Sequence, residues 1–346
     1  MKTAIIGDVH LSRYGQDVEG DSGVSERLKS IHDSLYEMAN LCKEKTIPNM
    51  IFTGDIFHNK SFVYSVAQNI FINFLKDFPD IHFYVIDGNH DLSGKVGQVV
   101  SSLKGIEDRK NVTWITATDG NLFWKHPTEN ILFVPYSEGM VDVIKKNKAD
   151  TLISHFGLNE GMLNSGISIR SNISIKDLKG HYKNVFLGHY HKPQEYIDAD
   201  IQAYYIGSII QLDWGEKDDI KRFIVVDTKN MKVSSIPINN YKKHIEIEVN
   251  KGNQKEAIER ALKAKEQGDH VKIIVTENIT LPKDLDISII DRSEKDITNR
   301  GITANMNQNE RLKKYLMIRD IKEEHHDMFI KLANEVIDAC AEEQTT

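Results

Sequence analysis

Short apolar runs recur along the first half of the chain, and most of them are followed at once by residues that can bind a metal ion. Runs of this length and composition are typical of strands that are buried on both faces. Because helical periodicity fills the stretches between the early runs, we expect an α/β core built in layers. The predicted strands are Ala4–Ile6, Met50–Phe52, His82–Ile86, Ile131–Val134, Thr151–Ile153 and Val185–Leu187.

Helical spacing is clear in the stretch that begins at Ser25, where Leu28 and Ile31 start a stripe of apolar residues three or four positions apart. A second helix is predicted at about 64–78. After Gly188 the chain changes to strands separated by turns, which predicts a second sheet packed on the first. The expected architecture is a four-layer β-sandwich flanked by helices. The later strands are predicted at Tyr204–Ile206, Phe223–Val226 and Val233–Ile238.

The chain is predicted to have three parts. Residues 1–240 hold the strands and motifs of the main domain, and residues 241–305 have the pattern of a small α+β module. Residues 306–346 contain two helical stretches, and an apolar stripe on the second runs from Met328 to Cys340.

Charge and cysteine content limit the function classes. A net charge of −7, from 44 Lys and Arg against 51 Asp and Glu, disfavours a general nucleic-acid coat protein but permits an enzyme that acts on nucleic acid. No apolar stretch approaches the roughly 20 residues that cross a bilayer, and a strand at the N-terminus leaves no room for a signal peptide. With only Cys42 and Cys340, no disulfide framework is expected, which favours the cytoplasm.

The polar residues that follow the predicted strands have the chemistry of metal ligands. Asp8 and His10 are two positions apart, as are His189 and His191. In extended backbone such pairs point to one face, so each pair is expected to present two ligands together. Asp55 follows a strand and a glycine, where the backbone can turn closely. Asn89, His90 and His155 complete the candidate set.

We expect these segments to converge, because ligands gather at the carboxyl ends of strands in layered α/β folds. Carboxylate, amide and imidazole donors without thiolates suit Mn²⁺, Fe or Zn²⁺ and disfavour a structural zinc site. The hard oxygen donors favour Mn²⁺, with Mg²⁺, Fe and Zn²⁺ as alternatives. Two such ions about 3.5–4 Å apart can clamp a phosphoryl group and activate water. The pattern therefore predicts a two-metal site for phosphate ester chemistry.

Each motif alone has a simpler interpretation. A Gly-Asp pair after a strand is usually a turn, and a buried histidine usually packs in a core. Five motifs in one chain, most of them after an apolar run, favour a functional site instead. His58 lies three residues after Asp55 on the same loop, so it can either reach a substrate or serve as a surface residue.

These residues resemble the calcineurin-like metallophosphoesterase superfamily and, within it, the SbcD-type DNA repair and recombination nucleases. The short C-terminal region is similar in layout to the bacteriophage recombination nuclease subunits. The resemblance covers about the first 240 residues well and the remainder only in layout. The matching segments are Asp8–His10, Gly54–His58, Gly88–Asp91, Gly188–Gln194, Tyr205–Ser208 and Trp214–Glu216.

The resemblance implies roles for individual residues. His90 would stabilise or protonate the leaving oxygen when water attacks phosphorus in line, and His58 would position the DNA strand. One metal ion would be held by Asp8, His10 and His191, the other by Asn89, His155 and His189, and Asp55 would bridge the two.

The resemblance also implies partners. Residues 241–305 would form a capping domain that steers DNA, and the helices after residue 305 would bind the coiled-coil base of an SbcC-like ABC-type ATPase. The stripe from Met328 to Cys340 suits such docking, although it can also pack on the chain's own body. A homodimer in the cytoplasm is implied, in the host cytoplasm if the chain is of phage origin.

The leading hypothesis is a dinuclear-metal-dependent DNA nuclease, either exonuclease or endonuclease, in double-strand break repair or recombination. One alternative is a phosphatase or small-molecule phosphodiesterase of the same superfamily. Protein phosphatases carry Asp-Arg-Gly after the second motif, whereas this chain has Phe57-His58-Asn59-Lys60. Another alternative is a non-catalytic scaffold, which would be expected to lack a ligand, and here the full set is present.

Overall fold

The computed structural model describes residues 2–14, 24–95, 98–228, 230–282, 285–293 and 306–345, the last nine of them by backbone alone. The chain divides into two compact units, Met1–His244 and Ile245–Thr346. The predicted boundary between 305 and 306 borders residues 294–305, which lie outside the described part of the chain. The division into main, capping and partner-binding domains stays a prediction.

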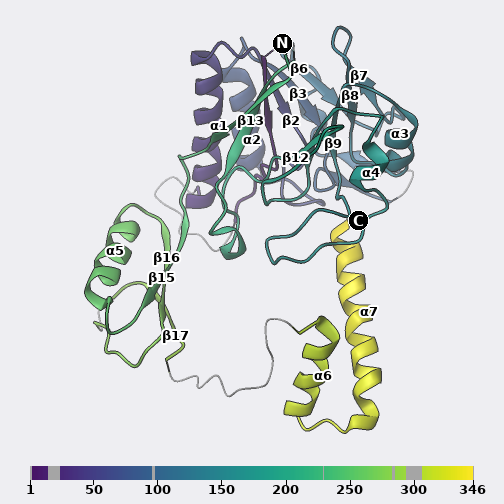
Figure 1. Ribbon diagram of the computed structural model, residues 1–346. Helices are drawn as coiled ribbons and strands as arrows, with labels where there is room; N and C mark the ends of the chain where they lie inside the picture. Colours follow the sequence, from purple (N-terminus) through teal and green to yellow (C-terminus); the bar gives the residue numbers. More distant parts are fainter. Residues whose placement is uncertain are drawn as a thin grey trace. The chain divides into compact units, whose positions relative to one another are not determined.

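Two six-stranded sheets form the centre of the first unit (Figure 1). In each sheet four neighbouring strands run parallel. The first sheet has the order β14 (Lys232–Pro237), β13 (Arg222–Asp227), β1 (Lys2–Ile6), β2 (Asn49–Phe52), β3 (His82–Ile86) and β6 (Val112–Ile115). The second has the order β11 (Gln194–Ile197), β12 (Gln202–Tyr205), β10 (Asn184–Gly188), β9 (Thr151–His155), β8 (Ile131–Val134) and β7 (Trp124–Lys125).

Alternation along the strands divides the core into two layers. On β2, Ile51 faces the second sheet, while its neighbours Met50 and Phe52 face the helices α1 (Glu26–Glu44) and α2 (Ser65–Asp77). Side chains i and i+1 of a strand point to opposite faces, so an apolar run is stable only where both faces are covered. The predicted burial of these strands on both faces is confirmed.

The outer face of the second sheet is covered by α3 (Met140–Lys146) and α4 (Ile175–Leu178), so the helices lie on both sides of the sandwich (Figure 1). Tyr182 is buried here and donates a hydrogen bond to the carbonyl of Ile144 at 2.7 Å. The predicted four-layer α/β sandwich is therefore confirmed.

The predicted division between the sheets is wrong. The second sheet begins before Gly188, with β7, β8 and β9, and β13 and β14 return to the first sheet. Val225 on β13 pairs with Ala4 on β1 in antiparallel register. A local sequence pattern can indicate that a strand forms. The pairing of β13 with β1 depends on contacts between residues more than 200 positions apart, and a local pattern holds no information about them.

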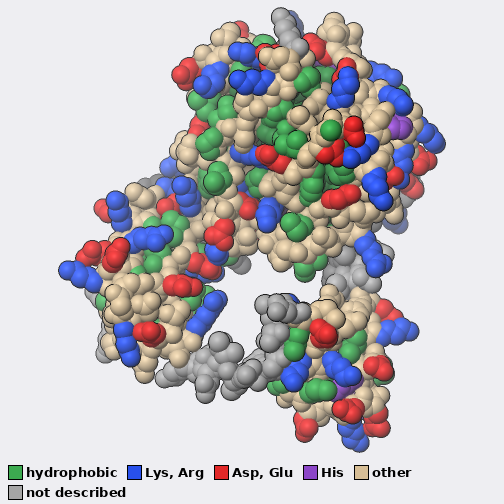
Figure 2. All heavy atoms as spheres, in the orientation of Figure 1, with side chains coloured by type: hydrophobic (Ala, Val, Ile, Leu, Met, Phe, Trp, Pro, Cys, Tyr) green, Lys and Arg blue, Asp and Glu red, His purple; other side chains and the backbone are tan. Residues whose placement is uncertain are grey.

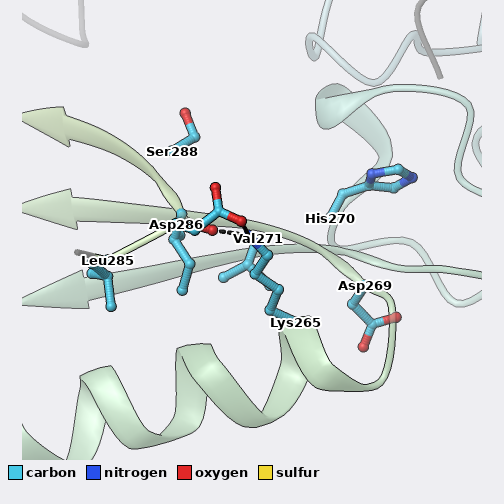
Figure 3. A pocket seen from close by; sticks show the side chains of 8 residues that line it. Lys265, Asp269, His270, Val271, Leu285, Asp286 and Ser288 are labelled. Carbon is cyan, nitrogen blue, oxygen red and sulfur yellow. Dashed lines mark hydrogen bonds and ion pairs between the residues drawn. The ribbon is translucent and has the colours of Figure 1, made fainter. Parts of the chain in front are cut away.

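The second unit contains a small sheet of β15 (His244–Val249), β16 (His270–Val275) and β17 (Ser288–Asp291), with α5 (Gln254–Glu266) on one face. At the end of α5, Lys265 forms an ion pair with Asp286 at 2.5 Å, beside Asp269 and His270 (Figure 3). These residues line a shallow pocket that carries both acidic and basic side chains, and its lysine already has an ion-pair partner.

The chain then forms α6 (Gln308–Ile318) and α7 (His326–Thr345), which contact each other. Met328, Leu332 and Val336 on α7 are exposed, and the side chains of 337–345 lie outside the described residues.

Within the described part of the chain, no helix is long and apolar enough to cross a membrane. Figure 2 shows Lys and Arg side chains interspersed with Asp and Glu on the face in view.

We predict that Phe186→Ala destabilises the sandwich by about 3–5 kcal/mol, because it leaves a cavity between the sheets. Phe186 is fully buried and stacks on Tyr204 with ring centroids 5.4 Å apart. Urea unfolding followed by circular dichroism measures the loss. Phe123→Ala is the matched control, since Phe123 is 40% exposed and should cost only about 0.5 kcal/mol. Equal losses in the two variants would contradict the assigned core.

Candidate metal centre

The candidate ligands lie in loops that leave the carboxyl ends of parallel strands. The loops after β1, β2 and β3 come from the first sheet, and the end of β9 and the loop after β10 come from the second. The amide of His10 donates to the carbonyl of Asp55 at 2.9 Å, which joins two loops of the first sheet. His155 Nδ1 donates to the carbonyl of Thr53 at 2.8 Å, which joins the two sheets. The predicted convergence of the motifs is therefore observed.

Three side chains form what we call the first ligand group: Asp8, His10 and His191. One ligand atom of each lies within 4.8 Å of the others. The Nε2 atoms of His10 and His191 face each other at 2.9 Å. Asp8 is fully buried, and its Oδ2 has no hydrogen-bond partner among the described residues.

Asn89, His155 and His189 form the second ligand group. Asn89 Oδ1 lies 3.0 Å from His155 Nε2 and 3.2 Å from His189 Nδ1. Because Nδ1 of His155 is held by the main-chain carbonyl of Thr53, its Nε2 is the atom that faces the group.

Asp55 lies between the two groups. Its Oδ2 is 3.3 Å from His155 Nε2 and 3.6 Å from His10 Nε2. Its Oδ1 accepts a hydrogen bond from the amide of His90 at 2.8 Å, which fixes the orientation of the carboxylate.

The donors in both groups fit divalent metal ions. Two ligand atoms that each lie about 2.0–2.1 Å from one ion, at a right angle, are about 2.9 Å apart. The pairs His10–His191 at 2.9 Å and Asn89–His155 at 3.0 Å have this spacing. An uncompensated buried carboxylate oxygen on Asp8 is costly unless a cation binds it. These residues are candidate metal-binding groups.

Charge within the centre is strongly coupled. Although burial favours its neutral form, the charge of Asp55 raises the pKa of His155 to about 9. Burial would raise the pKa of Asp55, but the charge of His155 and its hydrogen bond hold it well below the usual value. Burial and the charge of His155 lower the pKa of His189 to about 3. His189 therefore keeps a free lone pair, and His155 must lose a proton to bind metal.

His90 and His58 lie beside the ligand groups. His90 Nδ1 donates to the carbonyl of His58 at 2.6 Å, which leaves the other ring nitrogen, Nε2, for a substrate. The rings of His58 and His90 stack with centroids 5.8 Å apart, and His58 Nδ1 lies 3.4 Å from His10 Nδ1. His58 is exposed and His90 is half-buried.

The expected pairing of ligands is observed for Asp8 and His10, which lie together in the first ligand group, and is wrong for His189 and His191, which enter different groups. Asp8 and His10 do not alternate along extended backbone, because His10 has a φ of 53°. His189 likewise has a φ of 94°, so its ring approaches Asn89 while His191 approaches His10. Positive φ is strained for residues other than glycine and is concentrated at functional sites.

Two further acidic residues support the centre, and neither is assigned a role by the motif pattern. Asp91 is buried and accepts hydrogen bonds from the amides of Phe57 at 3.0 Å and Gly88 at 2.9 Å, which ties two motif loops together. Glu216 accepts from His191 Nδ1 at 3.0 Å. Burial would raise the pKa of Glu216, but His191 and a nearby lysine lower it to about 2. Only the match at Trp214–Glu216 provides a signal for this residue.

A two-sheet sandwich that gathers histidine, carboxylate and amide donors at its strand ends defines a metal-dependent hydrolase. The family model for calcineurin-like phosphoesterases matches residues 1–221, and the chain belongs to this family.

The individual proteins to which the chain is similar share little sequence identity with it. The chain is 27% identical over 138 residues to the SbcD component of the nuclease SbcCD from Staphylococcus saprophyticus, and the match spans 38% of this chain and 35% of that protein. A dimetal phosphatase from Danio rerio is similar in structure, with a TM-score of 0.42 and 11% identity over 69% of this chain and 99% of that one. A phosphatase from Mycoplasma pneumoniae has a TM-score of 0.39 and 14% identity over 69% and 93% of the two chains.

We predict that Gly88→Ala weakens metal binding more than about tenfold, because the added Cβ would displace a proposed ligand. That Cβ would lie 2.2 Å from Asp55 Oδ1 and 2.3 Å from the Asp55 amide nitrogen. Equilibrium dialysis with Mn²⁺ measures the affinity. Gly105→Ala is the control, since its Cβ would lie at an ordinary 3.9 Å from Gln68. Wild-type affinity in Gly88→Ala would refute the role of this close approach.

Proposed function

We propose that this chain is a two-metal-dependent DNA nuclease that acts with an ABC-type ATPase in double-strand break repair or recombination. The observation on which the proposal rests is the convergence of two ligand groups from both sheets on Asp55. Such a centre suits in-line attack of water on a phosphodiester.

In this proposal the first ligand group would hold one ion, the second ligand group would hold the other, and Asp55 would contribute to both. Bound metal would supply charge that lowers the pKa of water and stabilises the attacking and leaving oxygens. Hard carboxylate and amide oxygens beside imidazoles favour Mn²⁺. His90 would stabilise or protonate the leaving oxygen, because its ring lies 5.0 Å from the ring of His10 while its Nδ1 is held by the His58 carbonyl.

One observation supports DNA as the substrate, and a second disfavours a protein phosphatase. His58 stands on the loop after β2, exposed and beside His90, where it can position a nucleic-acid strand. The chain also has Phe57-His58-Asn59-Lys60 at the place where protein phosphatases have Asp-Arg-Gly. The partial similarity to the SbcD component of an SbcCD nuclease supports the same choice.

The second unit supplies the proposed partner contacts. The β15–β17 sheet with α5 is the proposed capping module. The exposed side chains of Met328, Leu332 and Val336 recur every four residues on α7, which suits docking into a groove of a coiled-coil partner. A homodimer is part of the same proposal.

Cleavage assays on end-labelled double- and single-stranded DNA test the function. We expect cutting with Mn²⁺, less with Mg²⁺ and stimulation by the partner ATPase. The same preparations are offered p-nitrophenyl phosphate and bis-p-nitrophenyl phosphate. Hydrolysis of these esters without any cutting of DNA would overturn the nuclease proposal in favour of a phosphatase or small-molecule phosphodiesterase.

We predict that His90→Asn lowers DNA cleavage by about 10²–10⁴-fold, because proton transfer to the leaving oxygen is lost. Metal content, measured by elemental analysis, should stay at the wild-type value, since His90 is not a proposed ligand. His32→Asn on α1 is the control and should leave both quantities unchanged. Full cleavage by His90→Asn would refute its catalytic role.

A further inference from the structure

Behind the ring of His191 lies a cluster of buried ionic side chains that the proposed reaction does not use. Glu216 is 1% exposed and Lys221 is 0% exposed. Their carboxylate and ammonium groups are 2.7 Å apart. A buried ion pair seldom stabilises a fold more than apolar residues of similar volume would. The presence of this pair at this position therefore needs an explanation other than stability.

Glu216 uses both of its oxygens. Oε1 accepts the hydrogen bond from His191 Nδ1 at 3.0 Å. Oε2 faces Lys221 and accepts further hydrogen bonds from Ser208 Oγ at 2.9 Å and from the Leu212 amide at 3.1 Å. The carboxylate is therefore immobilised by several donors before it orients the imidazole.

Lys221 acts on the same histidine from a second side. Its Nζ donates to the main-chain carbonyl of His191 at 3.1 Å. It also donates to Ser208 Oγ at 2.9 Å and to Asp219 Oδ2 at 3.2 Å. The ring and the backbone of His191 are thus held by two members of one ion pair.

The turn that contains Glu216 is itself fixed. This turn includes the 3₁₀ segment Trp214–Glu216. Gln211 Nε2 donates to the carbonyls of Lys217 at 3.0 Å and Asp219 at 3.1 Å, and its Oε1 accepts from the His244 amide at 2.7 Å. The position of the carboxylate is therefore set by the fold of the first unit.

We infer that Glu216 and Lys221 are positioning residues, which fix His191 so that its Nε2 faces the other members of the first ligand group, where an ion would bind. This inference rests on the proposed metal centre. His155, in the second ligand group, donates to the neutral carbonyl of Thr53 instead. A carboxylate partner makes an imidazole a stronger donor to metal than a carbonyl partner does, so the pair acts on one of the two ions.

The test compares Mn²⁺ binding by the full-length chain and its variants, with equilibrium dialysis for affinity and electron paramagnetic resonance for the bound ions. The main variant is Glu216→Gln with Lys221→Met, which removes both charges of the buried pair and leaves Asp219, 11% exposed, without its lysine partner. We expect one ion to bind about 10–100-fold more weakly, the spin-coupled signal of an ion pair to fade, and both to return at higher Mn²⁺ concentration.

The matched control is Glu195→Gln with Arg222→Met. Arg222 follows Lys221 in the chain and forms an ion pair with Glu195. Its other guanidinium nitrogen donates to the Tyr205 carbonyl at 3.2 Å. The control should bind two ions with wild-type affinity, whatever its change in melting temperature.

Wild-type affinity for both ions in the Glu216→Gln/Lys221→Met variant would overturn the inference. If that variant does not fold, the nearly isosteric Glu216→Gln alone decides by the same measurement. Failure of the wild-type chain to bind two ions would instead refute the proposed metal centre. Two bound ions without DNA cleavage would refute the nuclease assignment and leave the positioning role intact.

Discussion

The whole centre depends on how closely the backbone of one sheet can approach that of the other at the strand ends. A Cβ on Gly54, which has a φ of 99°, would lie 2.6 Å from His155 Nδ1, and one on Gly188 would lie 2.5 Å from the Thr53 carbonyl. Glycine at these two positions lets loops from both sheets meet without intervening side chains. The inter-sheet hydrogen bond from His155 to Thr53 then becomes possible, and the ligand groups form around Asp55.

Charge in the centre is arranged for a cation rather than for the protein's own stability. Asp8 Oδ2 is buried without a partner among the described residues, and the rings of His10 and His191 meet nitrogen to nitrogen. Although burial favours neutral His155, the charge of Asp55 raises its pKa, so the anionic surroundings favour a positive charge at this place. A bound cation would give these buried donors a common charged partner, so it would also stabilise the loops that supply the ligands.

Local features of the fold and centre were predictable from sequence. The strands, the helix that begins after Ser25 and the candidate ligands are properties of short segments, and the structure brings those ligands together. Non-local features were not. The return of β13 to pair with β1, the positive φ of His10 and the contact of Glu216 with His191 all arise from distant parts of the chain meeting. The spacing of apolar residues along the sequence does not indicate such long-range contacts.

Because β13 and β14 belong to the first sheet, they determine where the folded domain ends. The family match stops at residue 221, one position before β13 begins. A chain shortened there would leave the hydrogen-bonding groups of β1 open along one side, and an open edge strand invites association with other chains. The minimal folding unit therefore extends past the family boundary, at least to the end of β13 at Asp227.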